Sequence, residues 1–225
     1  MIGTIVNTCT IIVGSLIGAM LKKGIKPQYQ TALFNAMGVV SLAIGLRAFI
    51  TYMPQSQYPV LFIVSLSVGS LVGYMLDIDG RFNRLVTKHS KGNLGKGLSI
   101  GILLYCIGAL SMLGPVISAL QGDNTFLFTN ATLDLVTSAV LATTYGIGMI
   151  WAAPVLFCWQ GMFYLIARIS ATAISNDLIA ELSVVGGLLI LAAGLNLLKI
   201  KDCKTLNMLP SLIVPVIFFL IKSLF

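Results

Sequence analysis

The chain has 225 residues, of which 57% are hydrophobic and 9% are charged, and its formal net charge is +7. Soluble domains carry about 25% charged residues, so this composition excludes an ordinary soluble protein and indicates a polytopic α-helical protein of the lipid bilayer. The basic residues fall in short loops between apolar runs, where membrane insertion accounts for them, and nucleic-acid binding is not expected.

Eight stretches are long and apolar enough to cross a hydrocarbon layer of about 30 Å. The first begins at Ile2 without a basic leader, so we expect a retained helix and no cleaved signal peptide. The predicted spans are residues 3–21, 31–51, 59–76, 98–119, 131–149, 153–170, 180–199 and 207–223.

Basic residues are distributed unevenly over the predicted loops. Eleven of the fourteen lie in the first, third and seventh loops, and only Arg47, Arg168 and Lys222 fall on the opposite face. The positive-inside rule therefore predicts that both termini are extracytoplasmic. The eleven are Lys22, Lys23, Lys26, Arg81, Arg84, Lys88, Lys91, Lys96, Lys199, Lys201 and Lys204.

The first three spans resemble the last three. Residues 6–46 match residues 155–195 at 11 of 41 positions, whereas apolar segments of this bias should match at roughly a tenth. The offset is five spans, an odd number, which predicts inverted three-helix repeats of the kind found in many secondary transporters. The alternative is chance recurrence of Gly and Leu.

The expected single transmembrane domain, 1–225, comprises repeat one (1–76), a cytoplasmic basic loop (77–97), central helices (98–150) and repeat two (151–225).

Two G-x-x-x-G motifs occur in similar contexts, "VGSLIGAML" and "VGSLVGYML". Gly14 with Gly18, and Gly69 with Gly73, let helix backbones approach closely, and packing is favoured over a ligand site. The two helices are expected to pack against each other or across the interface of a homodimer.

A proline interrupts the fourth predicted span. Pro115 has no N–H to donate and its ring clashes with the carbonyl of Ser111, so the sequence predicts a kinked or broken helix between Ser111 and Pro115, beside Gly114. A broken helix would resemble those that bind ions and substrates in transporters. An ordinary proline kink is the alternative.

Asp134 is the acid that the sequence places inside a helix. In "TNATLD", Thr129 or Asn130 reads as an N-cap with Asp134 about one turn later, which favours a capping-region acid. An intramembrane acid also suggests a functional site, and Ser138 follows on the same face. Asp123 is expected to be a turn residue.

Other polar residues of the spans either form helix–helix hydrogen bonds or line the same path. These are Asn7, Asn35, Ser183 and Asn196, and the weaker acidic candidates are Asp177 and Glu181. The chain has isolated cysteines, one histidine and no catalytic motif, so we expect no enzyme activity, cofactor or metal site.

Several segments together resemble the domain of unknown function 554 family of bacterial inner-membrane proteins. They are "GTIVNTCTIIVGSLIGAML", "LDIDGRFNRL", "LFTNATLD" and "ELSVVGGLLILAAGLNLLKIK", in order over nearly the whole chain. The resemblance implies a membrane protein presumed to transport an unknown substrate. We expect secondary transport of a small solute or ion, coupled to H⁺ or Na⁺, with a channel and a membrane scaffold as alternatives.

Overall fold

The computed structural model describes residues 1–21, 26–81, 84, 98, 101–102, 104–106, 109–169 and 175–222. Every regular element in these ranges is a helix, which confirms the all-α polytopic class. Most of the predicted cytoplasmic loop 77–97, and much of the start of the predicted span 98–119, lie outside the described residues.

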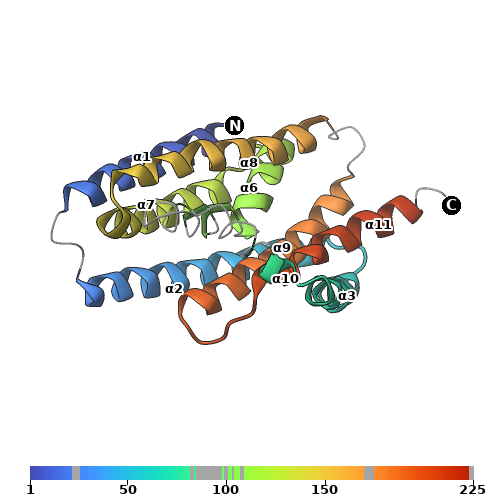
Figure 1. Cartoon of the computed structure of the whole chain (residues 1–225). Helices are drawn as coiled ribbons and strands as arrows, with labels where there is room; N and C mark the ends of the chain where they lie inside the picture. The colour runs from blue at the N-terminus through green and yellow to red at the C-terminus, as the bar shows by residue number, and fades with distance from the viewer. Residues whose placement is uncertain are drawn as a thin grey trace. The chain divides into compact units, whose positions relative to one another are not determined.

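The described helices reproduce the predicted spans (Figure 1). Seven segments are long and apolar enough to cross a membrane, and α3 is a shorter apolar helix, so each predicted span overlaps one of these eight. The long helices are α1 (Ile2–Met20), α2 (Pro27–Tyr52), α3 (Leu61–Met75), α6 (Ala109–Gln121), α7 (Thr125–Tyr145), α8 (Ala152–Ile169), α9 (Asn176–Leu197) and α11 (Ile213–Lys222). The short ones are η1 (Met53–Gln55), η2 (Ile147–Trp151), α10 (Thr205–Met208) and η3 (Leu209–Leu212).

The chain divides into two compact units. Unit one contains Met1–Asn35 and Phe82–Ala171, and unit two contains Ala36–Arg81 and Thr172–Phe225. Unit one therefore includes α1, α6, α7 and α8, whereas unit two includes most of α2 together with α3, α9, α10 and α11.

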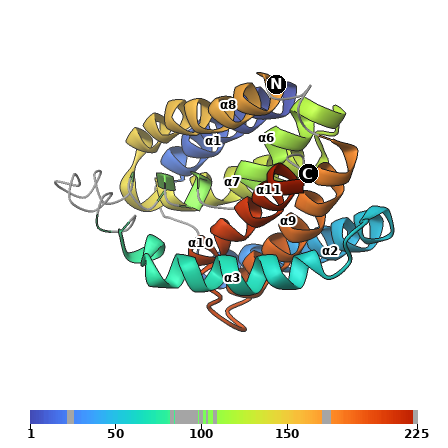
Figure 2. The same cartoon turned by 90° about the vertical axis from the view of Figure 1, so that its right-hand side faces the viewer.

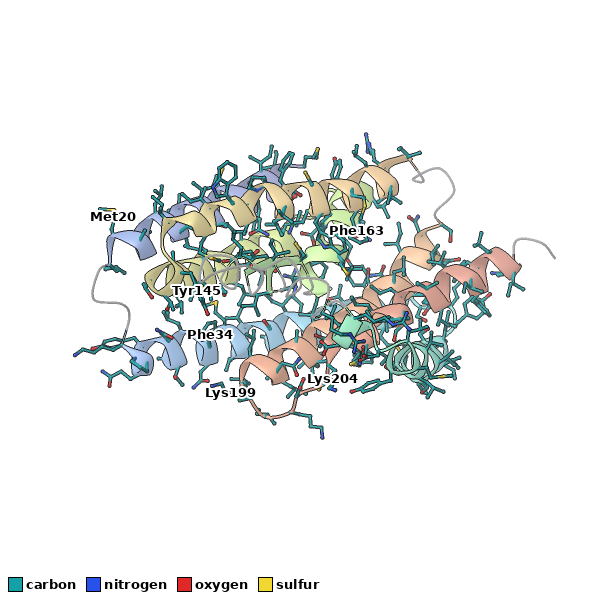
Figure 3. All side chains as sticks on the ribbon, viewed as in Figure 1. Met20, Phe34, Tyr145, Phe163, Lys199 and Lys204 are labelled. Atoms are coloured by element: carbon teal, nitrogen blue, oxygen red, sulfur yellow. The ribbon has the colours of Figure 1, made fainter. Side chains whose placement is uncertain are left out.

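In unit one, α1 lies along α7 in the same direction. A Cβ added to Gly3 would lie 2.6 Å from the Leu127 Cβ, and one added to Gly18 would lie 2.8 Å from the Ala142 Cβ. The residue numbers rise together along both helices, and Figure 3 shows Met20 and Tyr145 at the corresponding ends. The predicted topology also requires this direction, because its first and fifth spans cross the membrane in the same sense.

The helix α8 runs beside α1 in the opposite direction (Figure 2). Met1 at the start of α1 approaches Gly161 in the second half of α8. Between these helices and the segment that precedes α6 lies an apolar core. Its central members are Ile11, Tyr105, Cys106, Ala152, Ala153 and Leu156.

In unit two, α2 crosses α9 at glycines. A Cβ on Gly45 would lie 2.6 Å from the Gly187 carbonyl oxygen, and one on Gly194 would lie 3.0 Å from that of Gly38. Residue numbers fall along α9 as they rise along α2, so the two helices are antiparallel. The missing side chains let the backbones touch, which is how small residues drive helix association in lipid.

Each of the two G-x-x-x-G motifs packs against other residues of its own unit. Gly18 packs against α7, while Gly69 and Gly73 of α3 pack against Ser211 and Asn207. These glycines therefore pack closely against neighbouring residues, as predicted, while the expected contact between the two motifs stays a prediction. A homodimer stays a prediction, without support from these motifs.

Glu181 ties the connection between η1 and α3 to α9. Its buried carboxylate accepts hydrogen bonds from the Ser56 hydroxyl at 2.6 Å and from the Tyr58 backbone N–H at 3.1 Å. This weaker candidate for the transport path therefore has a local structural role. Asp177 lies in the first turn of α9, where a carboxylate complements the helix dipole.

We expect Glu181→Ala to destabilise the protein. A hydrogen bond to a charged group contributes about 1.5–3 kcal/mol, and two donors would lose their acceptor. Thermal unfolding of the purified protein in detergent checks this, with Asp177→Ala as the matched control on the same helix. Equal, small effects of both substitutions would contradict the assignment.

Candidate functional site

Asp134 lies deep in α7, not at its start. The helix begins at Thr125 with Asn124 as its N-cap residue, which makes Asp134 the tenth of 21 residues. The predicted helix start at Thr129 or Asn130 is therefore wrong. Asp123 accepts a hydrogen bond from the Thr125 N–H at 2.8 Å, so this turn residue sets the N-cap at Asn124, five to six residues earlier than predicted.

This position removes the capping explanation for Asp134. The tenth residue lies about 14 Å along the axis from the first, whereas the helix dipole acts within the first turn. Asp134 is also only 4% exposed. A buried carboxyl in the middle of a membrane-spanning helix needs partners from neighbouring residues.

Two asparagines flank the Asp134 carboxyl. Asn130, one turn earlier on α7, donates its amide N–H to Asp134 Oδ2 at 2.9 Å. Asn7 of α1 lies beside the same carboxyl, although its amide nitrogen makes no hydrogen bond of standard geometry. The Thr10 hydroxyl donates to the Asn7 carbonyl oxygen at 2.7 Å and so ties these two α1 residues together.

Tyr105 and Cys106 approach the carboxyl from the segment that precedes α6. Both are buried and within electrostatic range of Asp134, and the Tyr105 hydroxyl lies next to that of Ser138. The Tyr105 hydroxyl has no hydrogen bond of standard geometry. We call Asn7, Tyr105, Asn130, Asp134 and Ser138 the Asp134 cluster.

Backbone contact between α1 and α7 holds the cluster together. A Cβ on Gly14 would collide with the Ser138 hydroxyl and the Leu135 carbonyl. Gly14 therefore fixes the distance between the helix that carries Asn7 and the helix that carries Asp134.

The predicted interruption of the fourth span is not present. α6 continues from Ala109 to Gln121 with Pro115 inside it. Proline removes one backbone hydrogen bond, but neighbouring helices can hold a membrane helix in shape at such a point. Gly114 lets α6 approach Leu127, where an added Cβ would lie 3.1 Å from the leucine side chain. The kink itself stays a prediction.

Ser111 joins α6 to α8 instead of lying at a break. Its hydroxyl accepts a hydrogen bond from the Gln160 amide at 3.1 Å, and both residues are fully buried. The Gln160 side-chain oxygen has no partner in this structure. This polar pair belongs to the same unit as the Asp134 cluster, but no hydrogen bond joins the two sets among the described residues.

The remaining predicted residues lie on α2 and in unit two. Asn35 is exposed on α2. In unit two, Ser183 is buried on α9 with an unpaired hydroxyl, and Asn196 accepts a hydrogen bond from the Cys203 N–H at 2.7 Å. Asn196 thereby closes the turn between α9 and α10, on which Lys199 and Lys204 lie (Figure 3).

Of the predicted site residues, the structure thus brings together Asn7, Asp134 and Ser138. Sequence reasoning missed two members of the cluster. Asn130 had a usable signal, because residues four apart share a helix face. Tyr105 had none, because its approach to Asp134 depends on how a distant segment packs.

Comparison with known proteins gives the chain a family. The family model described as "Protein of unknown function (DUF554)" matches residues 2–220. The chain belongs to the DUF554 family. It is 54% identical to the "Uncharacterized membrane protein YdfK" of Bacillus subtilis, over 99% of this chain and 98% of the relative. It is 26% identical to the "Uncharacterized protein YqgA" of Escherichia coli, over 94% and 93% respectively. No solved structure matches it.

The cluster in this DUF554 protein offers one carboxyl, two amides and two hydroxyls. No basic side chain of the described ranges pairs with Asp134, whose direct partner is an amide. The same ranges hold no group of three His, Cys, Asp or Glu side chains that could bind a metal ion. Such a site can bind a proton or another small positively charged species, or a polar solute.

Proposed function

We propose that this DUF554 protein is a secondary transporter of a small solute or ion, driven by an ion gradient, with Asp134 as the coupling or substrate-binding acid. One observation carries the proposal: the Asp134 carboxyl is buried in the middle of a membrane-spanning helix without a basic partner in the described part of the chain.

The energetics favour a functional role for Asp134. A charged Asp at the centre of a membrane helix costs about 2.5–3.5 kcal/mol on insertion scales. Membrane proteins keep such residues mainly on ion and substrate paths. A carboxyl that alternately carries and releases a positive charge would couple a gradient to a conformational change.

The glycine crossing of α2 and α9 supports the inverted repeat. At the offset of 149 residues, Gly38 corresponds to Gly187 and Gly45 corresponds to Gly194. In the structure Gly38 meets Gly194, and Gly45 meets Gly187. Such reciprocal contacts arise when two equivalent segments pack about a two-fold axis. Inverted repeats of this kind underlie alternating access in many transporters.

The division into units is consistent with the same architecture. The two proposed repeats contribute their first helices, α1 and α8, to unit one. Their later helices fall in unit two, apart from the start of α2. In many secondary transporters alternating access arises when one repeat or bundle rocks against the other.

We also propose a cytoplasmic-membrane location with both termini outside the cell. Support comes from the eleven of fourteen basic residues in the first, third and seventh predicted loops. Single cysteines placed at Gln28 and Gln55, which are exposed near opposite ends of α2, would test the orientation in whole cells. Labelling of position 55 alone by an impermeant reagent is expected, and labelling of position 28 alone would reverse the topology.

A thermal-stability screen of the purified protein against metabolites and ions tests the function first. A ligand that binds the folded state raises the unfolding temperature. The solute that does so is then measured in proteoliposomes, with and without an imposed ion gradient. Accumulation above equilibrium supports a transporter, purely downhill flux favours a channel, and no flux of any stabilising solute favours a scaffold.

A further inference from the structure

We propose that the coupling ion at Asp134 is a proton, and that the Asn7 amide and the Tyr105 hydroxyl serve both the neutral and the ionised carboxyl. This inference rests on the proposed function, because it names the ion used by the same site. The uptake step is the addition of one H⁺ to the Asp134 carboxylate to give the neutral acid, and the release step reverses it.

The charge of the cluster limits the ion to a single positive charge. Asp134 is the one carboxyl of the Asp134 cluster, and its neighbours Asn7, Asn130, Ser138 and Tyr105 are uncharged polar residues. A divalent cation would leave an uncompensated positive charge in an apolar surrounding, which is strongly unfavourable. One proton or one monovalent metal ion would make the site neutral.

The groups around the carboxyl favour a proton over a metal ion. Hard metal cations need several oxygen ligands around them. Asp134 Oδ2 instead receives an amide N–H from Asn130 at 2.9 Å. On the side that faces Gly14 of α1, an added Cβ would collide with the Ser138 hydroxyl, so this side has no space for a further ligand atom. A proton needs neither a ligand shell nor added volume.

Two groups near the carboxyl can form hydrogen bonds with both its neutral and its ionised form. The Asn7 amide nitrogen and the Tyr105 hydroxyl are both buried and have no hydrogen-bond partner of standard geometry. An ionised carboxyl only accepts hydrogen bonds, whereas a neutral one also donates. The Asn7 amide can present N–H or, after rotation, C=O, and the Tyr105 hydroxyl can donate or accept.

Among the described residues, two other titratable groups act near Asp134. Tyr105 and Cys106 approach it from the segment before α6, while α1 contributes the amide of Asn7. Phenol and thiol side chains are ordinarily neutral at pH 7. The carboxyl is therefore the group of this cluster whose charge the binding of one proton would change.

Difference infrared spectroscopy of the reconstituted full-length protein tests the inference directly. We expect a carbonyl stretch from a protonated carboxylic acid that disappears as the pH rises. The band should be absent from Asp134→Asn, present in Asp134→Glu at a shifted position, and unchanged in Asp123→Asn. Replacing choline by Na⁺ should leave the titration midpoint in place.

Two results would overturn the proton assignment. One is a spectrum in which Asp134→Asn removes no protonated-acid band at any pH. The other is a midpoint that moves to lower pH as Na⁺ is added, because Na⁺ would then compete for the carboxylate. Asn7→Leu should move the midpoint and keep the band, and an unmoved midpoint would remove Asn7 from the proton site.

The outcome separates this inference from the proposed function. If the Asp134 band titrates but the protein accumulates no solute, the proton site is supported and the transporter function is rejected. If a Na⁺ gradient alone drives accumulation, the transporter function is supported and the proton is rejected as the coupling ion.

Discussion

Asp134→Asn is expected to reduce gradient-driven uptake to the background of empty liposomes while the protein remains folded. The amide has nearly the same size as the carboxyl. Its oxygen can still accept the hydrogen bond from Asn130, which is 2.9 Å long in the unmodified protein. It cannot take up or release a charge, so binding of the coupling ion is lost. Uptake by proteoliposomes and thermal unfolding of the same preparation are the two measurements.

The stability of this variant carries separate information. Replacing a buried group that can ionise with a neutral isostere removes a desolvation penalty, so the unfolding temperature should not fall. The matched control is Asp123→Asn, which alters an acid of the preceding turn whose carboxylate accepts from the Thr125 N–H at 2.8 Å. That control should transport normally.

Unchanged flux through Asp134→Asn would contradict a coupling role and favour the channel. A loss of uptake in Asp123→Asn as severe as in Asp134→Asn would also count against a special role for Asp134.

Gly14→Ala is expected to destabilise unit one and impair uptake together. The added Cβ would collide with the Ser138 hydroxyl and the Leu135 carbonyl, so α1 must move away from α7. Overpacking of this kind costs about 1–3 kcal/mol, and for a chain of this size about 2–4 °C in unfolding temperature per kcal/mol. The same movement would draw Asn7 away from Asp134.

Gly161→Ala is the matched control for this substitution. Gly161 also lies in a membrane-spanning helix of unit one, but an added Cβ would have its nearest contact at 3.9 Å, the end of the flexible Met1 side chain. Alanine is favoured over glycine within a helix by about 0.5–1 kcal/mol, so stability should hold or rise. A Gly14→Ala protein as stable as Gly161→Ala would show that α1 and α7 do not touch there.

Membrane spans could be predicted from the sequence because the hydrocarbon layer imposes a local requirement. Every backbone polar group must be bonded within its own helix, and about 20 apolar residues are needed to cross. This requirement acts on each segment by itself. The same reasoning selected Asp134 as the acid to examine, since an ionisable residue in an apolar helix is rare whatever its neighbours are.

Local patterns were less reliable at helix ends and breaks. The polar run at Thr129–Asn130 looked like a helix start, but α7 begins at Thr125. Pro115 looked like a break, yet α6 continues through it. At the start of α7 the turn at Asp123 sets the boundary, whereas at Pro115 packing outweighs the preference of one residue, because packing contributes more to helical stability.

The partners of each helix depended on the tertiary structure alone. The G-x-x-x-G motif of α1 predicted a close contact, but only the fold showed that Gly14 and Gly18 meet α7. Asn7 and Tyr105, about a hundred residues apart in sequence, likewise reach Asp134 only after their helices pack. A G-x-x-x-G motif indicates that one face of a helix can pack closely against another helix. Which helix packs there depends on the shapes of all the helix surfaces in the chain, and no local pattern contains that information.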